Sequence, residues 1–178
     1  MLGMGTVGSE VIRFMADNAD SLAARIGAPL ELRGVAVRDL TKDRGLDPEL
    51  LTADPASLVS REDVDVVVEL MGGIDVPRPL LLEALRNGKS VVTANKALLA
   101  EYTDELAEAV DSTGTDLYFE AAVAGAIPVI GPLRRSMAGD QVERVVGIVN
   151  GTTNYILSEM GSTGADYSET LAEASRLG

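Results

Sequence analysis

The residues whose spacing indicates chemistry most directly are three glycines near the start of the chain. Gly3, Gly5 and Gly8 form a G-x-G-x-x-G pattern that runs straight into a stretch with helical periodicity. In a dinucleotide-binding turn, the first glycine makes the turn, the second lets the backbone approach a pyrophosphate, and the third lets the helix pack closely on a sheet. Glycines also occur at the starts of helices simply because they fit the turn there, without any ligand. The nucleotide-contacting residues that the pattern predicts are Gly3, Met4, Gly5, Thr6, Val7 and Gly8.

Three further segments are expected just beyond the carboxyl ends of strands, where ligands bind in parallel sheets. In Met71-Gly72-Gly73, the glycines would let the backbone come close to a ligand. Thr93-Ala94-Asn95-Lys96 places a lysine immediately past a short strand, although a lysine there is also explained as a surface residue. The third segment is Asn150-Gly151-Thr152-Thr153.

The second predicted strand ends in Arg38 followed by Asp39. An acidic residue at this place would bind a ribose 2′-hydroxyl, whereas Arg38 could receive a 2′-phosphate, with Lys42 as a second cation. NADP(H) is therefore favoured over NAD(H). A solvated charge pair at a strand end explains the same residues.

Cysteine and histidine are both absent from the chain. The sequence therefore excludes a disulfide framework, a zinc site of the usual Cys/His kind and a thiol nucleophile in this chain. It also excludes Ser-His pairs and a histidine base. Proton transfer must use Lys, Asp, Glu, Tyr or water.

The formal charge of −13 argues against a nucleic-acid partner or an anionic membrane partner. The longest charge-free stretch, Ala121 to Leu133, contains two glycines and two prolines and is shorter than the roughly 18 apolar residues of a membrane span. No basic leader precedes an apolar segment, so we expect a cytoplasmic protein.

Helical and strand patterns alternate through the first two thirds of the chain, which predicts an α/β fold. We expect a Rossmann-like, doubly wound parallel sheet with helices on both faces, and with most of its first strand missing because only Met1 and Leu2 precede the glycines. The predicted helices are Gly5 to Asp17, Pro77 to Asn87 and Asp104 to Ser112, and the predicted strands are Leu30 to Val37, Val64 to Leu70, Ser90 to Thr93 and Leu117 to Ala121.

Composition changes near residue 125, where small residues and glycines become frequent. We therefore predict a nucleotide-binding domain over residues 1–125 and the incomplete beginning of an α+β catalytic and dimerisation domain over 126–178. In this second part Ile127 to Met137 should be helical, Val142 to Val149 a strand, and Asp166 the start of a last helix, since Asp166 and Glu169 resemble a capping box.

Five blocks in this order resemble homoserine dehydrogenase, and the resemblance spans the chain. The last two are the most specific. The blocks are Gly3-Met4-Gly5-Thr6-Val7-Gly8, Val35-Ala36-Val37-Arg38-Asp39, Thr93-Ala94-Asn95-Lys96-Ala97-Leu98, Phe119 to Pro128 and Gly147 to Leu157.

This resemblance implies reversible hydride transfer between L-homoserine and L-aspartate 4-semialdehyde, with NAD(P)H as the carrier, on the route to threonine and methionine. Lys96 matches the family's lysine between nicotinamide and substrate, where it would act as the main catalytic residue. Gly72, Thr93 and Ala94 match cofactor-contacting positions, and Gly151 with Thr152 resembles the loop that closes over the nicotinamide.

The resemblance also implies a monovalent cation, sodium, held by backbone carbonyls; a tight inter-domain hinge explains the same glycine-rich segment. By motif match the ligands are Glu120, Val123, Gly125 and Ile127.

The family's substrate-binding Glu and Asp and its second Lys lie beyond the last helix, so this chain is expected to be an inactive fragment of a homodimer or tetramer. Two alternatives remain: another NAD(P) oxidoreductase of amino-acid metabolism, or a nucleotide-sensing module without catalysis.

Overall fold

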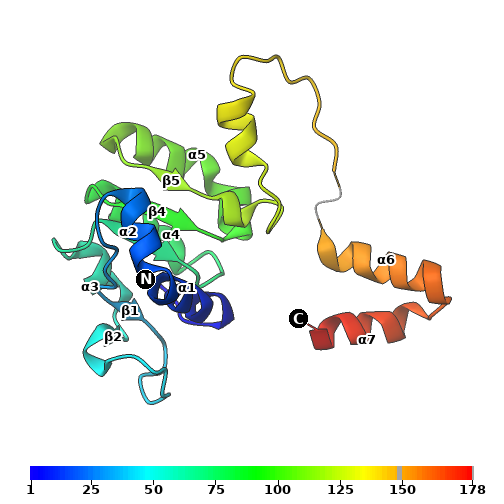
Figure 1. The fold of residues 1–178 in the computed structure, drawn as a ribbon, viewed down its shortest axis with the longest axis horizontal. Helices are drawn as coiled ribbons and strands as arrows, with labels where there is room; N and C mark the ends of the chain where they lie inside the picture. The colour runs from blue at the N-terminus through cyan, green and yellow to red at the C-terminus, as the bar shows by residue number, and fades with distance from the viewer. Residues whose placement is uncertain (148–149, 178) are drawn as a thin grey trace. The chain divides into compact units, whose positions relative to one another are not determined.

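The computed structural model describes residues 1–147 and 150–177, which form two units. The first unit comprises Met1–Ala122 and the second Val123–Gly178, so the division lies close to the boundary at residue 125 that the sequence predicts. Figure 1 shows parallel strands and helices in the first unit and a pair of helices, α6 and α7, in the second. Each unit is described by itself below.

The first unit is built on short parallel strands rich in β-branched residues. β3 (Val66–Glu69) pairs with β4 (Ser90–Thr93), which pairs with β5 (Leu117–Tyr118). A second set joins β1 (Val35–Ala36) to β2 (Leu51–Thr52). Both sets are parallel throughout, as buried strands joined by helical crossovers require.

Leu2 connects these two sets into one sheet. It forms parallel bridges to Ala36 of β1 and to Glu69 of β3, and its side chain is fully buried. Its N–H donates to the carbonyl of Val68 at 2.7 Å, and its own carbonyl accepts from Leu70 N–H at 2.8 Å. The joined order is β2, β1, Leu2, β3, β4, β5. With the Leu2 segment counted as the first strand, this is the doubly wound order 3-2-1-4-5-6, which confirms the predicted fold class.

The helices of the first unit begin and end at residues suited to those positions. Asp54 caps α3 by accepting from the N–H groups of Ala56 and Ser57, and Asn95 caps α5 by accepting from Leu98 N–H. Gly114 ends α5 in the left-handed conformation, at φ +69°. The helices are α1 (Thr6–Asp17), α2 (Ala19–Ile26), α3 (Pro55–Ser60), α4 (Pro77–Arg86) and α5 (Lys96–Thr113), with a 3₁₀ turn over Pro48–Leu50 and another over Glu120–Ala122.

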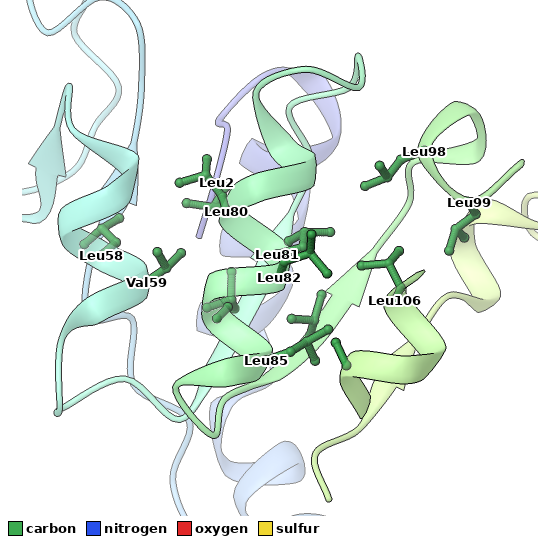
Figure 2. Packing of buried hydrophobic residues seen from close by; sticks show 14 of the residues in the cluster. Leu2, Leu58, Val59, Leu80, Leu81, Leu82, Leu85, Leu98, Leu99 and Leu106 are labelled. Carbon is green, nitrogen blue, oxygen red and sulfur yellow. The ribbon is translucent and has the colours of Figure 1, made fainter. Parts of the chain in front are cut away.

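The core of the first unit lies under α4, which packs against α3, α5 and the strands β3 and β4. Figure 2 shows Leu58 and Val59 of α3 to one side of the α4 leucines and Leu106 of α5 to the other. The connection from Leu2 to β1 runs along the sheet in the opposite direction to those through α4 and α5. Right-handed crossovers therefore put α1 on the other face.

The second unit contains a π-helical turn over Pro132–Ser136 and two helices, α6 (Gly151–Thr163) and α7 (Tyr167–Leu177), which pack on each other. Gly164 ends α6 in the left-handed conformation, at φ +72°. The buried side chains of this helix pair are Ile156, Thr170 and Ala174. Among the described residues, no helix combines the length and the apolar character that crossing a bilayer requires.

Several predicted elements differ from the observed ones. The strand predicted over Leu30 to Val37 shrinks to β1, because only its end reaches the Leu2 segment and β2. In the strand predicted over Val142 to Val149, residues 142–147 are exposed and not in a strand, and the last two residues lie outside the described residues. The helix predicted over Ile127 to Met137 is reduced to a short turn around Pro132–Ser136.

Candidate functional site

Two of the three patterned glycines are required by close backbone packing. Gly3 has φ +95°, and a Cβ there would lie 2.8 Å from the carbonyl oxygen of Leu70. A Cβ on Gly8 would lie 2.6 Å from the carbonyl oxygen of Gly3. Any side chain at either position would therefore displace backbone, so the turn and its fit against β3 depend on these two glycines.

Gly5 differs, because a Cβ at this position would meet no atom of the described chain within 4 Å. Gly5 is the N-cap of α1, and within the described residues no side chain caps that helix start. The first N–H groups of a helix need an acceptor, and they favour an anion. Open space over uncapped N–H groups is what a bound pyrophosphate requires, so this turn fits the dinucleotide that the sequence predicts.

A cleft of about 670 Å³ opens beside the glycine turn, between α1 and the loop that follows β1. Met4, Gly5 and Thr6 line one side of it, and Lys42 and Arg44 the other. The predicted cation Lys42 therefore faces the turn. Arg38 is exposed and lies outside this set of lining residues.

Arg44 is a residue of this cleft that sequence reasoning missed. Its guanidinium donates to the carbonyl of Met4 at 3.1 Å and to the carbonyl of Asp39 at 3.2 Å, so it ties the glycine turn to the chain leaving β1. Its Nε is buried and has no hydrogen-bond partner among the described residues. The only sequence signal for Arg44 is that it is the third basic residue, after Arg38 and Lys42, in the segment that follows the strand predicted to end at Val37.

The glycine turn, the Gly72 turn and Lys96 lie at one edge of the sheet. Leu2 is in register with Glu69 of β3, and Glu69 is in register with Thr93 of β4. The chain leaves these three aligned positions into Gly3, Leu70 and Ala94. The segments that the sequence places beyond strand ends are therefore neighbours, as the rule for ligand sites in doubly wound sheets expects.

Gly72 and Gly73 form a left-handed turn after β3, with φ values of +72° and +77°. The fully buried carboxylate of Glu69 holds this turn: its Oε1 accepts from Met71 N–H at 2.8 Å and from Gly72 N–H at 3.1 Å. The sequence pattern identified the glycines but not the carboxylate that orients them.

Lys96 is exposed and is the first residue of α5, immediately after the capping Asn95. A lysine is unfavourable there, because the positive end of the helix dipole lies at the N-terminus. The helix itself therefore gives no stabilising reason for this cation, whereas an anionic ligand at the same sheet edge would.

An ion pair fixes α5 against α4. Arg78 contacts Glu105 through two hydrogen bonds of 2.7 and 3.1 Å, and its guanidinium lies 4.1 Å from the ring centroid of Tyr102. Hydrogen bonds from Arg78 lower the pKa of the Glu105 carboxyl below its usual range. Tyr102 is a kink in α5, with φ −130° and ψ 23°, so this ion pair anchors the part of α5 that follows the kink.

Gly151 and Thr152 belong to the second unit, where they form the first turn of α6 and not the loop after a strand that the sequence predicts. Asn150 caps this helix by accepting from Thr153 N–H at 2.8 Å. The segment forms a helix and not a loop because Asn150 supplies a cap and the residues after Thr153 supply an apolar face that packs on α7. Their role at a nicotinamide stays a prediction.

The candidate cation ligands Glu120, Val123, Gly125 and Ile127 fall on both sides of the division between the units. Within the second unit, Ala124 and Gly125 both have φ +59°, so the backbone turns sharply there. The sodium site stays a prediction.

A glycine turn with uncapped helix N–H groups at the edge of a doubly wound sheet is the arrangement of dinucleotide-binding domains. Comparisons with known proteins identify the family. Residues 3–120 match the family model for the NAD-binding domain of homoserine dehydrogenase, and residues 128–178 match the homoserine dehydrogenase model. The chain belongs to the homoserine dehydrogenase family, whose members are NAD(P)-dependent oxidoreductases acting on a hydroxyl group.

The relatives are similar over the whole chain. Homoserine dehydrogenase of Corynebacterium glutamicum is 64% identical over 179 residues, and that of Mycobacterium tuberculosis is 65% identical over 178 residues. A crystal structure of a homoserine dehydrogenase from Thiobacillus denitrificans matches 99% of the chain with a TM-score of 0.92 and 44% identity. A hyperthermophilic archaeal homoserine dehydrogenase in complex with NADPH matches 99% of the chain with a TM-score of 0.82 and 26% identity.

These relatives are considerably longer. The chain covers 40% of the two curated relatives, 41% of the Thiobacillus chain and 59% of the archaeal chain. It therefore spans about two fifths of the curated relatives that it matches.

Proposed function

We propose that this chain provides the nucleotide-binding part, and the beginning of the catalytic part, of a homoserine dehydrogenase. The reaction would be reversible hydride transfer between L-homoserine and L-aspartate 4-semialdehyde, serving threonine and methionine synthesis. The observation that carries this proposal is the alignment of Leu2, Glu69 and Thr93, which brings the glycine turn and Lys96 to one sheet edge in a chain of this family.

The residues of the first unit would divide the work between binding and chemistry. Gly5 and the first N–H groups of α1 would hold the pyrophosphate, and the Gly72 turn with Ala94 would form the nicotinamide side. Thr93, which the family resemblance implies as a cofactor contact, is 0% exposed and would act from beneath this surface. A bound nicotinamide would supply the hydride carrier. The Lys96 ammonium would donate a hydrogen bond to the reacting oxygen or to the substrate carboxylate, which polarises or orients the substrate.

We further propose NADP(H) as the preferred cofactor. Lys42 and Arg44 line the cleft beside the glycine turn, and Arg38 lies two residues after the end of β1. Two cations in this cleft, with Arg38 nearby in the sequence, favour a 2′-phosphate over a bare hydroxyl.

Sodium on the carbonyls of Glu120, Val123, Gly125 and Ile127, assembly into a homodimer or tetramer and a cytoplasmic location complete the proposal. They rest on the family resemblance, and for the location on the sequence. Turnover is expected to need residues beyond this chain, because the proton-transferring Glu, Asp and second Lys that the resemblance implies have no counterpart in it.

A titration of the 178-residue chain with NADPH and NADH in parallel tests the binding proposal. Tighter binding of NADPH is expected, and Arg38→Asp should reverse the preference. Equal affinity for both cofactors in both proteins would contradict the assignment of Arg38.

Turnover is tested separately. Homoserine-dependent reduction of NADP by the purified chain is expected to be undetectable, and measurable turnover would refute the fragment reading. In an enzyme extended to the length of its relatives, Lys96→Ala should nearly abolish activity while leaving cofactor affinity largely unchanged.

A further inference from the structure

A closed ring of hydrogen bonds, some buried and some partly buried, joins the Gly72 turn to the start of α5. The Thr93 hydroxyl donates to Oε2 of Glu69 at 2.6 Å and accepts from Asn95 N–H at 3.0 Å. The Asn95 amide then donates from Nδ2 to the carbonyl of Gly73 at 2.7 Å, which returns the ring to the turn. Oε1 of Glu69 closes it by accepting from Met71 N–H and Gly72 N–H.

The three side chains of this ring are buried almost completely, whereas Gly72 and Gly73 are exposed. Glu69 and Thr93 are 0% exposed and Asn95 is 6% exposed. Burying a carboxylate is costly unless donors surround it, and here Glu69 accepts three hydrogen bonds. The strands alone would not require this arrangement, because Thr93 and Glu69 are already paired through their backbones.

Two features place the ring beside the proposed chemistry. It fixes consecutive left-handed residues, Gly72 and Gly73, which a regular strand ladder cannot hold. It also includes the residue directly before Lys96, since Oδ1 of Asn95 caps α5 while its Nδ2 reaches Gly73. One amide side chain therefore sets both the start of the helix that carries Lys96 and its spacing from the turn.

We propose that Glu69, Thr93 and Asn95 are positioning residues that hold the Gly72 turn and Lys96 in register on the nicotinamide side of the cofactor site. This inference rests on the proposed function for what binds there. Because all three side chains are buried, they act through the backbone of the turn and of α5 and not by touching the ligand. The glycine turn supplies no hydrogen-bond partner to the ring, so loss of the ring should affect the adenosine half of the site less than the nicotinamide half.

Thr93→Val tests the ring at its central hydroxyl with little change in volume and none in charge. It leaves Oε2 of Glu69 and the Asn95 N–H without their partner, whereas Thr93→Ser keeps both hydrogen bonds. Affinities are measured by titration with NADPH and, for the adenosine half alone, with adenosine 2′,5′-bisphosphate. Thr93→Val should weaken NADPH binding about tenfold and leave bisphosphate binding within about twofold, and Thr93→Ser should restore NADPH binding.

Asn95→Asp gives an independent test, because aspartate keeps the cap on α5 but cannot donate to Gly73. It should weaken NADPH binding without weakening bisphosphate binding. Asp54→Asn is the matched control: it exchanges the same two residue types at the cap of α3, outside the ring, and should change neither affinity.

Unchanged NADPH affinity in Thr93→Val would overturn the proposal, as would an equal loss for both probes or a failure of Thr93→Ser to rescue. If the unsubstituted chain binds neither probe, the proposed function fails. Amide hydrogen exchange then tests whether the ring holds the Gly72 turn. Loss of protection at Met71 and Gly72 in Thr93→Val but not in Thr93→Ser would support it, and equal protection in both would overturn it.

Discussion

The two units of the chain differ in what holds their candidate site residues. In the first unit, residues far apart in the sequence meet across a parallel sheet and are fixed by a continuous core under α4. In the second, α6 and α7 are neighbours in sequence, and few side chains are buried between them. Long-range contacts thus define the site residues of the first unit, whereas local capping defines Gly151 and Thr152 in the second.

The largest effect is expected from the core of the first unit. Leu81 is fully buried, so Leu81→Ala should reduce the free energy of unfolding by about 2–5 kcal/mol. Leu157→Ala in α6 removes a side chain that is 64% exposed and should cost less than about 0.5 kcal/mol. Urea unfolding followed by circular dichroism measures both. Equal losses would break the distinction between the units.

The glycine turn should separate stability from binding. Gly8→Ala forces a Cβ against the carbonyl of Gly3, so it should reduce the free energy of unfolding by about 1–3 kcal/mol. It should also weaken NADPH binding. Gly5→Ala has open space, so its stability should stay within about 0.5 kcal/mol of the parent while NADPH affinity falls tenfold or more.

Gly161→Ala, inside α6, is the control for the two glycine variants: helix propensity should make it stabilising by roughly 0.5–1 kcal/mol, with NADPH binding unchanged. Full NADPH affinity in Gly5→Ala would contradict the assignment of the pyrophosphate to this turn. Melting curves and a fluorescence titration on the same preparations separate the two quantities.

A smaller loss is expected at Lys89, which is 5% exposed and donates from Nζ to the carbonyls of Arg61 at 2.5 Å and Val64 at 2.9 Å. Lys89→Met keeps the length of the side chain but leaves both carbonyls without this donor, so it should cost about 1–3 kcal/mol. The exposed Lys42→Met is the control and should be nearly neutral for stability. Similar unfolding midpoints for the two variants would show that the buried ammonium does not brace the start of β3.

The smallest expected effect is a pH dependence from an exposed ion pair. The hydrogen bond from Arg61 lowers the pKa of Asp63 from 3.8 to about 2. Because the folded pKa lies below the unfolded one, this stabilisation is present above about pH 4 and is lost as the pH falls toward 2. Melting temperatures between pH 5 and pH 2 should therefore fall slightly less in Asp63→Asn than in the parent chain. A steeper fall in the variant would contradict this sign.

Local sequence signals predicted the first unit better than the second. β-branched runs and capping residues located β3, β4, α4 and α7, because these elements follow from propensity, burial period and turn chemistry. The short helices α2 and α3 were missed since each spans only about two turns. The strand predicted from Val142 onward failed over residues 142–147 because a β-branched run becomes a strand only where another strand pairs with it.

By itself, the sequence determined the doubly wound fold, the place of the glycine turn and the family, since these depend on residue types at fixed spacings. Only the tertiary structure decided how these segments are aligned and which buried side chains connect them. The register of Leu2, Glu69 and Thr93 brings separate segments to one edge, and buried side chains tie that edge together. The Glu69–Thr93, Asn95–Gly73 and Arg44–Met4 hydrogen bonds have no sequence signature, because each joins groups more than 20 residues apart that only the folded sheet brings together.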